Sequence, residues 1–257
     1  MQRLLFALII TSLMACSRNT PKNVDYGQEH QIHFYGPDSL KIYGDLYKTN
    51  KDANTIVLFH QGGSNARAEY RTIIPELTAM GYNILAVDLF LGGQRYGSFN
   101  RTISGVALDN FKNPSSYCDD YDNMVATLQY VKQQGFTGKT IIWGSSYSAT
   151  LAIKLGSEYT NDVAGVLSFS PAAGPPMQDC QPNAYIEAIS VPLIILKPPN
   201  EMGSENAKTQ FELAAKHGHQ AYAAEAGVHG SSMLVPERVN GDVAPNWAVV
   251  KAFLETL

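Results

Sequence analysis

The chain has 257 residues, of which 45% are hydrophobic and 16% charged, and this composition excludes an intrinsically disordered protein. Its 19 basic and 23 acidic residues give a net charge of −4, which argues against electrostatic binding to nucleic acid. Three cysteines are too few for a disulfide scaffold, and the length suits one large α/β domain or two small ones.

The N-terminus carries the features of an export signal. Arg3 precedes an apolar run at 4–15, which is long enough for a signal-peptide core and shorter than the roughly 20 residues of a spanning helix. The tetrad at 13–16, Leu-Met-Ala-Cys, resembles the lipobox of bacterial lipoproteins. The resemblance implies cleavage before Cys16, its acylation (palmitate among the chains) and a lipid anchor in the bacterial cell envelope. Ser17 favours the outer membrane, facing the periplasm. The alternative is an ordinary secretory signal with an incidental cysteine.

The remaining chain divides into a polar tether at 16–28 and one predicted domain at 29–257. Apolar runs predict strands at 30–35, 40–47, 55–59, 82–87, 140–143, 163–169, 191–196 and 220–225. Amphipathic spacing predicts helices at 65–80, 118–134, 146–157, 204–216 and 245–257, with long loops at 88–117 and 170–187. This alternation implies an α/β fold whose mainly parallel sheet has helices on both faces.

The most informative motif is Gly-Ser-Ser-Tyr-Ser at 144–148, between a predicted strand and a predicted helix. Small residues two positions either side of Ser146 allow a sharp turn that projects its hydroxyl beside a helix N-terminus. The motif resembles the nucleophile elbow of the α/β-hydrolase fold, more closely that of its dienelactone-hydrolase-like branch, although Ser148 replaces the usual Gly. The resemblance covers roughly 55–257. It implies an α/β-hydrolase fold with about eight mostly parallel strands, and a nucleophilic Ser146.

The same family places an acid and then a histidine after the nucleophile in the chain. His229 lies between the last predicted strand and the last helix, where the family carries its general base. Glu201 follows the strand at 191–196, where the family usually carries Asp; Asp179 is the weaker alternative. The acid accepts the Nδ1–H of the histidine and stabilises the imidazolium.

The resemblance also implies an oxyanion hole made of two backbone N–H groups. One belongs to Tyr147, directly after the nucleophile, and the other to the His-Gln-Gly-Gly-Ser segment at 60–64. We assign this second donor to Gly62, with Gln61 as the alternative.

Several polar residues admit two interpretations. His217 and His219 flank a glycine at a helix end, which favours helix capping over metal binding. Acidic residues at 119, 120 and 122 open a predicted helix, where they are more typical of helix-dipole partners than of a metal site. Arg95 and Arg101 are expected to be solvated or structural, the alternative being contact with an anionic substrate.

The sequence leaves two further features open. Cys118 and Cys180 remain after Cys16, and a disulfide between them is as plausible as two free thiols. Aromatic residues stand beside the predicted strand ends, where ligands bind in open α/β sheets, without indicating which of them line a pocket. They are Phe90, Tyr96, Phe99, Tyr117 and Tyr147.

The predicted function is that of a serine hydrolase of carboxylesterase type, acting on a small-molecule acyl ester through an acyl-enzyme, without cofactor or metal. The alternatives are a peptidase, lipase or acyltransferase with the same triad, or a non-catalytic binding lipoprotein. The missing apolar lid segment argues against a lipase. The expected partners are the substrate and, through Cys16, a membrane; the sequence leaves the oligomeric state open.

Overall fold

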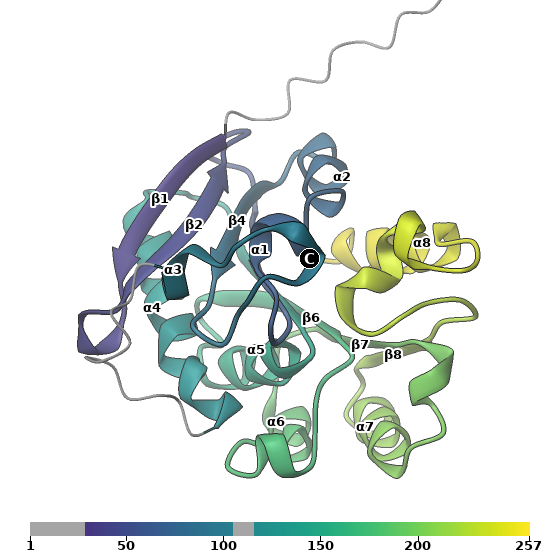
Figure 1. Ribbon diagram of the computed structural model, residues 1–257. Helices are drawn as coiled ribbons and strands as arrows, with labels where there is room; N and C mark the ends of the chain where they lie inside the picture. The colour runs from purple at the N-terminus through teal and green to yellow at the C-terminus, as the bar shows by residue number, and fades with distance from the viewer. Residues whose placement is uncertain (1–28, 105–115) are drawn as a thin grey trace, which may run out of the picture.

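The computed structural model describes residues 29–104 and 116–257 (Figure 1). The predicted signal peptide, the tether and Cys16 lie outside the described residues, so the lipid anchor stays a prediction. Within the described ranges, every helix is too short or too polar to cross a membrane.

The strands of the described ranges follow the predicted order along the chain. They are β1 (Glu29–Tyr35), β2 (Lys41–Tyr47), β3 (Thr55–Phe59), β4 (Asn83–Asp88), β5 (Thr140–Ser145), β6 (Val163–Phe169), β7 (Leu193–Lys197) and β8 (Gln220–Ala223). The α-helices are α1 (Ala66–Glu69), α2 (Ile73–Ala79), α3 (Arg101–Ser104), α4 (Tyr121–Gln133), α5 (Tyr147–Glu158), α6 (Pro182–Ala188), α7 (Glu205–Lys216) and α8 (Ala244–Leu254). Short 3-10 helices occur at η1 (Pro37–Ser39), η2 (Arg95–Gly97), η4 (Tyr117–Asp120), η5 (Pro175–Met177), η6 (Pro199–Glu201), η7 (Gly230–Leu234) and η8 (Pro236–Arg238).

The strands form one sheet of eight strands in the order β1-β2-β4-β3-β5-β6-β7-β8. The β1–β2 and β2–β4 pairs are antiparallel, and every other neighbouring pair is parallel. This confirms the predicted mostly parallel sheet. Because β3 to β8 run in one direction, their carboxyl ends share an edge of the sheet, where ligands bind in open α/β folds.

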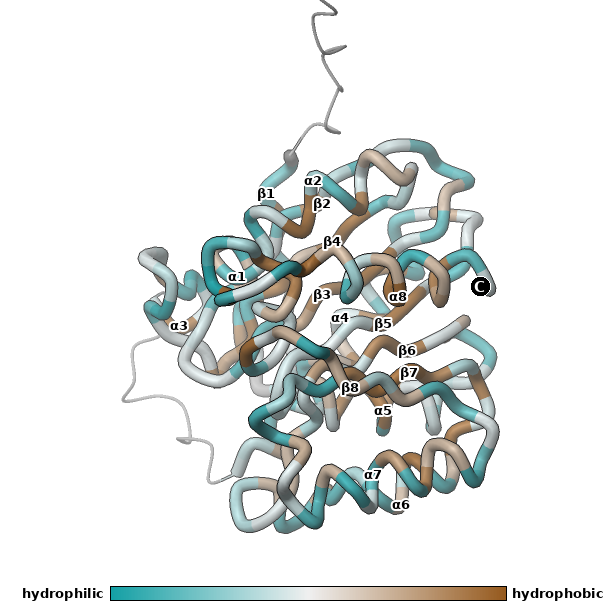
Figure 2. Tube along the Cα trace, turned by 90° about the vertical axis from the view of Figure 1, so that its right-hand side faces the viewer, coloured by the Kyte–Doolittle hydropathy of each residue, from teal (hydrophilic) through white to brown (hydrophobic). Residues whose placement is uncertain are grey.

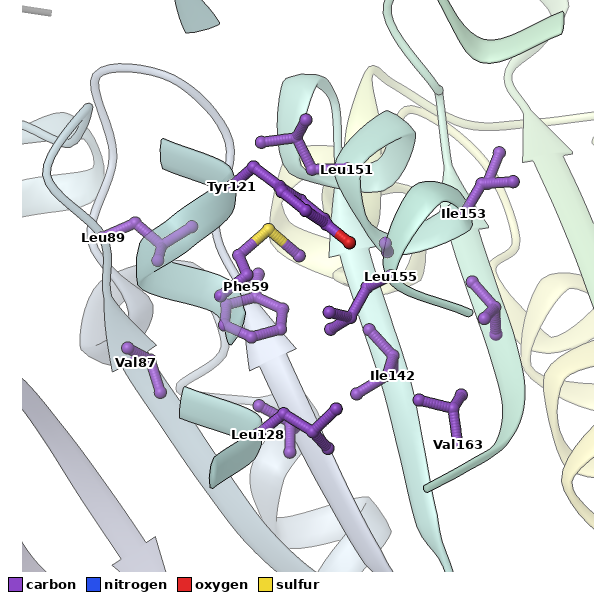
Figure 3. Packing of buried hydrophobic residues seen from close by; sticks show 14 of the residues in the cluster. Phe59, Val87, Leu89, Tyr121, Leu128, Ile142, Leu151, Ile153, Leu155 and Val163 are labelled. Carbon is purple, nitrogen blue, oxygen red and sulfur yellow. The ribbon is translucent and has the colours of Figure 1, made fainter. Parts of the chain in front are cut away.

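Helices cover both faces of the sheet (Figure 1). Alternate residues of each central strand face opposite sides: Val57 and Phe59 of β3 pack with α4 and α5, whereas Ile56 and Leu58 pack with α1, α2 and α8. Hydrophobic residues accordingly gather along the central strands (Figure 2). Phe59, Leu128 and Leu155 belong to the core of the first face (Figure 3). Burial on both faces explains why these strands are continuous apolar runs.

Two predicted segments differ from the structure. The single helix expected at 65–80 is two helices, α1 and α2, joined through Tyr70. Pro75 accounts for the break because its ring excludes the carbonyl of residue 71 from a continuous helix. The expected loop at 170–187 contains η5 and most of α6, which begins at Pro182, a residue favoured in the first turn of a helix.

Candidate active site

Ser146 occupies a strained turn between β5 and α5. Its backbone has φ 64° and ψ −119°, a conformation that side-chain-bearing residues rarely adopt. Its N–H donates to the carbonyl of Phe169 at 2.8 Å, which ties the turn to the end of β6. A side chain at Gly144 would collide with the backbone of the following helix. The turn therefore has the shape of the predicted nucleophile elbow.

Ser148 has a structural role where the family carries glycine. It is fully buried, and its Oγ accepts the N–H of Ser145 at 2.9 Å and donates to the carbonyl of Phe59 at 2.8 Å. The hydroxyl thus links the elbow to the end of β3. The departure from the family motif leaves the sharp turn intact and adds a contact to the neighbouring strand.

His229 and Glu201 come together at the same edge of the sheet. Glu201 ends η6, which follows β7, and His229 follows β8; the Nδ1 of His229 lies 2.6 Å from Oε1 of Glu201. Asp179, the weaker candidate acid, makes no such contact with His229. Within the described residues no hydrogen bond joins His229 to Ser146. Such bonds are often long in ligand-free enzymes and tighten when substrate binds.

Backbone contacts hold the His229 loop against the elbow. The N–H of Gly230 donates to Ser170 Oγ, and the N–H of Ser231 donates to Ser145 Oγ, each at 3.0 Å. Gly230 has φ 70°, and a Cβ there would collide with the Ser145 hydroxyl, so glycine is required at this position. The residue after His229 therefore packs on the residue before Ser146.

A buried lysine completes the surroundings of the acid. The Nζ of Lys197 lies 3.5 Å from Oε2 of Glu201 and donates to the Pro171 carbonyl at 3.3 Å, and Lys197 is only 5% exposed. Burial favours a higher pKa for Glu201, but the His229 hydrogen bond and the Lys197 charge outweigh it and lower the pKa. Burial lowers the pKa of Lys197 itself, against the opposing effect of Glu201. The lowered pKa favours the ionised form of Glu201, which is the form that best stabilises an imidazolium at His229.

The predicted oxyanion donors differ in what they already bind. The N–H of Gln61 donates to Oε2 of the fully buried Glu69 at 3.0 Å, which occupies the alternative donor. In the described part of the chain, the N–H groups of Gly62 and Tyr147 donate to no acceptor. These two groups are therefore available to an oxyanion.

Asp120 has a structural role beside the candidate site that the sequence interpretation missed. Beyond opening a helix, its buried carboxylate accepts the Tyr147 hydroxyl at 2.9 Å and the N–H groups of Phe90 and Leu91 at 3.1 and 2.8 Å. Burial, and then the Asp120 carboxylate, raises the pKa of Tyr147 well above its usual range. Asp120 thereby joins the residue after the nucleophile to the loop after β4.

Cys118 and Cys180 form a disulfide, with their Cα atoms 5.8 Å apart. Cys118 belongs to η4 and Cys180 to the loop between η5 and α6, so the bond joins two segments at the carboxyl edge of the sheet. The sequence left open whether these two cysteines pair, and the structure shows that they do.

The remaining polar candidates have structural partners. Arg101 bonds the buried carboxylates of Asp45 and Asp88 at 2.7 and 2.8 Å, which agrees with its structural interpretation. His217 caps α7 and His219 bonds the Ile189 carbonyl at 3.2 Å. In the ranges that the structure describes, no three His, Cys, Asp or Glu residues are grouped so as to hold a metal ion.

Comparison with known proteins identifies the fold. No family model and no curated protein matches the sequence. Among solved structures, an esterase of Pyrococcus furiosus is similar at 18% identity and a TM-score of 0.68, over 92% of this chain and 93% of that one. A dienelactone hydrolase of Anabaena variabilis is similar at 12% identity and a TM-score of 0.65, over 89% and 97%. An acylaminoacyl peptidase of Pyrococcus horikoshii matches at 14% and 0.63, over 91% of this chain but 42% of its own. At such identities the likeness shows the fold alone, and that fold is the α/β-hydrolase fold.

Proposed function

We propose that this protein is a serine hydrolase that cleaves carboxylic esters of small molecules through Ser146, His229 and Glu201. The observation that carries the proposal is the combination of a strained serine elbow with a 2.6 Å His229–Glu201 hydrogen bond at the same sheet edge. Similar structures include an esterase and a dienelactone hydrolase, which supports hydrolysis of an acyl bond.

In the proposed reaction, His229 removes the hydroxyl proton of Ser146 as Oγ attacks the ester carbonyl carbon. The oxyanion accepts hydrogen bonds from the N–H groups of Gly62 and Tyr147. His229 then gives its proton to the departing alcohol, which leaves an acyl group on Ser146. Water activated by His229 hydrolyses this acyl-enzyme. Throughout, Glu201 holds Nδ1–H and stabilises the imidazolium.

A fluorophosphonate probe tests the proposal directly, because such probes phosphonylate only an activated serine. We expect labelling of the intact protein, and peptide mass spectrometry should place the label on Ser146. Ser157→Ala, at the far end of α5, is the matched control and should label normally. A folded protein that takes up no probe would contradict the proposal and favour the non-catalytic binding alternative.

The Lys197 charge should appear in the pH dependence of catalysis. The Lys197 cation partly offsets the negative charge of Glu201. Replacing Lys197 with methionine removes this offset, so the full carboxylate charge stabilises the imidazolium form of His229. The acidic limb of the kcat/KM profile should therefore move to higher pH by about half a unit to one unit. The exposed Lys208→Met should leave the limb in place. If kcat/KM instead falls equally at every pH and the acidic limb does not move, Lys197 acts only in packing.

We further propose that the domain is tethered to the cell envelope through acylated Cys16, on the strength of the lipobox-like tetrad at 13–16. Cys16→Ser should release the protein from the membrane fraction. Unchanged membrane association of that variant would contradict the anchor.

A further inference from the structure

A cavity of about 450 Å³ opens at the carboxyl edge of the sheet. Its walls are the loop after β4 with Phe90 and Leu91, the start of η4 with Tyr117, and the loop between β6 and α6 with Gln178 and Asp179. The volume lies within the range of small-molecule sites. Nothing in the proposed reaction uses this space.

Tyr117 connects the cavity to the proposed oxyanion hole. Its ring stacks on that of Tyr147, with centroids 4.9 Å apart. Its hydroxyl faces Gly62, where an added Cβ would lie 3.0 Å away. The N–H of Gly63 also donates to the carbonyl of Leu91 at 3.1 Å. Tyr117 therefore belongs both to the wall of the cavity and to the surroundings of the proposed oxyanion hole.

The walls of the cavity are tied together through η4. Cys118 follows Tyr117, and its disulfide to Cys180 reaches the wall that carries Gln178 and Asp179. Two residues further on, Asp120 holds the loop after β4 through the N–H groups of Phe90 and Leu91. Because one short segment fixes both other walls, the cavity is preorganised and its width depends on the disulfide.

The position of the general base decides which part of an ester would enter the cavity. His229 must reach the departing alcohol to protonate it. No residue of the His229 loop or of η6 lines the cavity. Tyr117, which contacts Tyr147 and Gly62, does line it. The acyl group extends from the carbonyl away from the departing alcohol, so it is the part of the substrate that we assign to the cavity.

The lining also indicates the chemistry of that acyl group. The rings of Phe90 and Tyr117, together with Pro175 and Pro176, offer flat apolar surfaces suited to an aromatic ring. Among the described lining residues Asp179 is the one acidic residue, and none is basic. A carboxylate on the acyl group would therefore meet repulsion from Asp179.

We propose that this cavity is the acyl-binding subsite, that it selects uncharged aromatic acyl groups, and that the Cys118–Cys180 disulfide maintains its width. The inference rests on the proposed esterase function. The test compares the p-nitrophenyl esters of acetic, benzoic and para-carboxybenzoic acids, because they share a leaving group and differ only in the acyl part. We use kcat/KM, which reports acylation.

For the wild type, each kcat/KM is divided by the rate constant of hydroxide-catalysed hydrolysis of the same ester. We expect this ratio to be higher for the benzoate than for the acetate. The same ratio for the para-carboxybenzoate should be about 10-fold lower than for the benzoate. Reversing the charge with Asp179→Lys should raise the para-carboxybenzoate about 10-fold relative to the benzoate. Asp179 is exposed and its substitution should not disturb folding.

Filling and loosening the cavity give independent readouts. Gln178→Trp should lower kcat/KM for the benzoate about 10-fold or more relative to that for the acetate. The control Gln133→Trp, on the exposed end of α4, should leave kcat/KM for both esters unchanged. The double variant Cys118→Ser/Cys180→Ser should lower the benzoate about 5-fold relative to the acetate, because the walls separate. Fluorophosphonate labelling of the double variant establishes that it is folded.

The outcomes separate the subsite from the proposed function. Benzoate and acetate rates that fall together in Gln178→Trp, or a charge preference that Asp179→Lys leaves unchanged, would overturn the subsite while leaving the esterase function in place. A wild type that hydrolyses none of the esters and takes up no fluorophosphonate would overturn the proposed function and the subsite with it. A folded double variant with the wild-type benzoate-to-acetate ratio would overturn the role of the disulfide.

Discussion

Replacing Ser146 with alanine is expected to lower kcat for p-nitrophenyl acetate by about 10⁴- to 10⁶-fold, the range found when a triad nucleophile is removed. The loss arises because no covalent acyl-enzyme can form, and water must attack directly. A residual rate above that in water should persist, since the oxyanion donors at Gly62 and Tyr147 remain. Steady-state kinetics with active-site titration of the wild type provides the measurement.

The hydrogen bonds at Ser146 make this variant a clean test. Among the described residues these bonds use the Ser146 backbone, and its side-chain hydroxyl makes none. The melting temperature should therefore be retained. The buried neighbour Ser148, in contrast, bridges Ser145 and Phe59. We therefore expect Ser148→Ala to lower the melting temperature while the triad residues stay in place. Substantial esterase activity in Ser146→Ala would place the nucleophile elsewhere.

Replacing Glu201 with glutamine should lower kcat by about 10³- to 10⁴-fold, the effect seen when the triad acid becomes an amide. A neutral amide no longer stabilises the imidazolium of His229, and it can hold the ring in the wrong tautomer. Glu205→Gln is the matched control, because Glu205 opens α7 with its side chain 85% exposed and should leave kcat unchanged. The measurement is kcat for p-nitrophenyl acetate at saturating substrate.

Lys197 allows the catalytic and structural effects of this substitution to be separated. Glu201→Gln leaves the buried Lys197 ammonium without its carboxylate partner, so the melting temperature should also fall. Adding Lys197→Met removes that unpaired cation, and we expect the double variant to regain thermal stability but not kcat. Recovery of activity along with stability would show that Glu201 acts on folding and has no role in the reaction.

The pair formed by Glu201 and His229 also has a defined effect on stability. The pKa of Glu201 is lowered in the folded protein, so its contribution to stability is present above the unfolded-state value of about 4.3. That contribution is lost as the pH falls through the lower folded-state value. Acid weakens the fold at the same residue on which the proposed reaction depends.

Local patterns in the sequence were enough to predict the sheet and the main candidates for the site. Buried parallel strands must be continuous apolar runs, so β3 to β7 could be located from hydropathy alone. The elbow around Ser146 is also a local feature, since small residues beside it permit the turn. Resemblance in chain order then indicated His229 and Glu201. The helix predicted at 65–80 was wrong because a single proline outweighed its amphipathic spacing.

Tertiary structure alone decided the contacts between segments far apart in the chain. Asp120 had the appearance of a helix-dipole partner until the fold brought Tyr147 and the loop after β4 to its carboxylate. The sequence favoured Gly62 over Gln61 as the oxyanion donor without a contact to argue from, and only the fold shows that the Gln61 N–H is already bonded to Glu69. The Cys118–Cys180 pairing likewise depends on two loops meeting across 62 positions of sequence.

The physical reason lies in the range of each interaction. Hydrophobic periodicity and turn chemistry act within a few residues. The order of the strands along the chain and the serine elbow can therefore be predicted from the sequence of 257 residues. Hydrogen bonds, ion pairs and disulfides need groups within a few ångströms, and only the packed sheet determines which loops meet at its carboxyl edge. The sequence thus indicated the chemistry that we propose. The tertiary structure decided which groups hold Ser146, His229 and Glu201 in place and what shape of cavity lies near them.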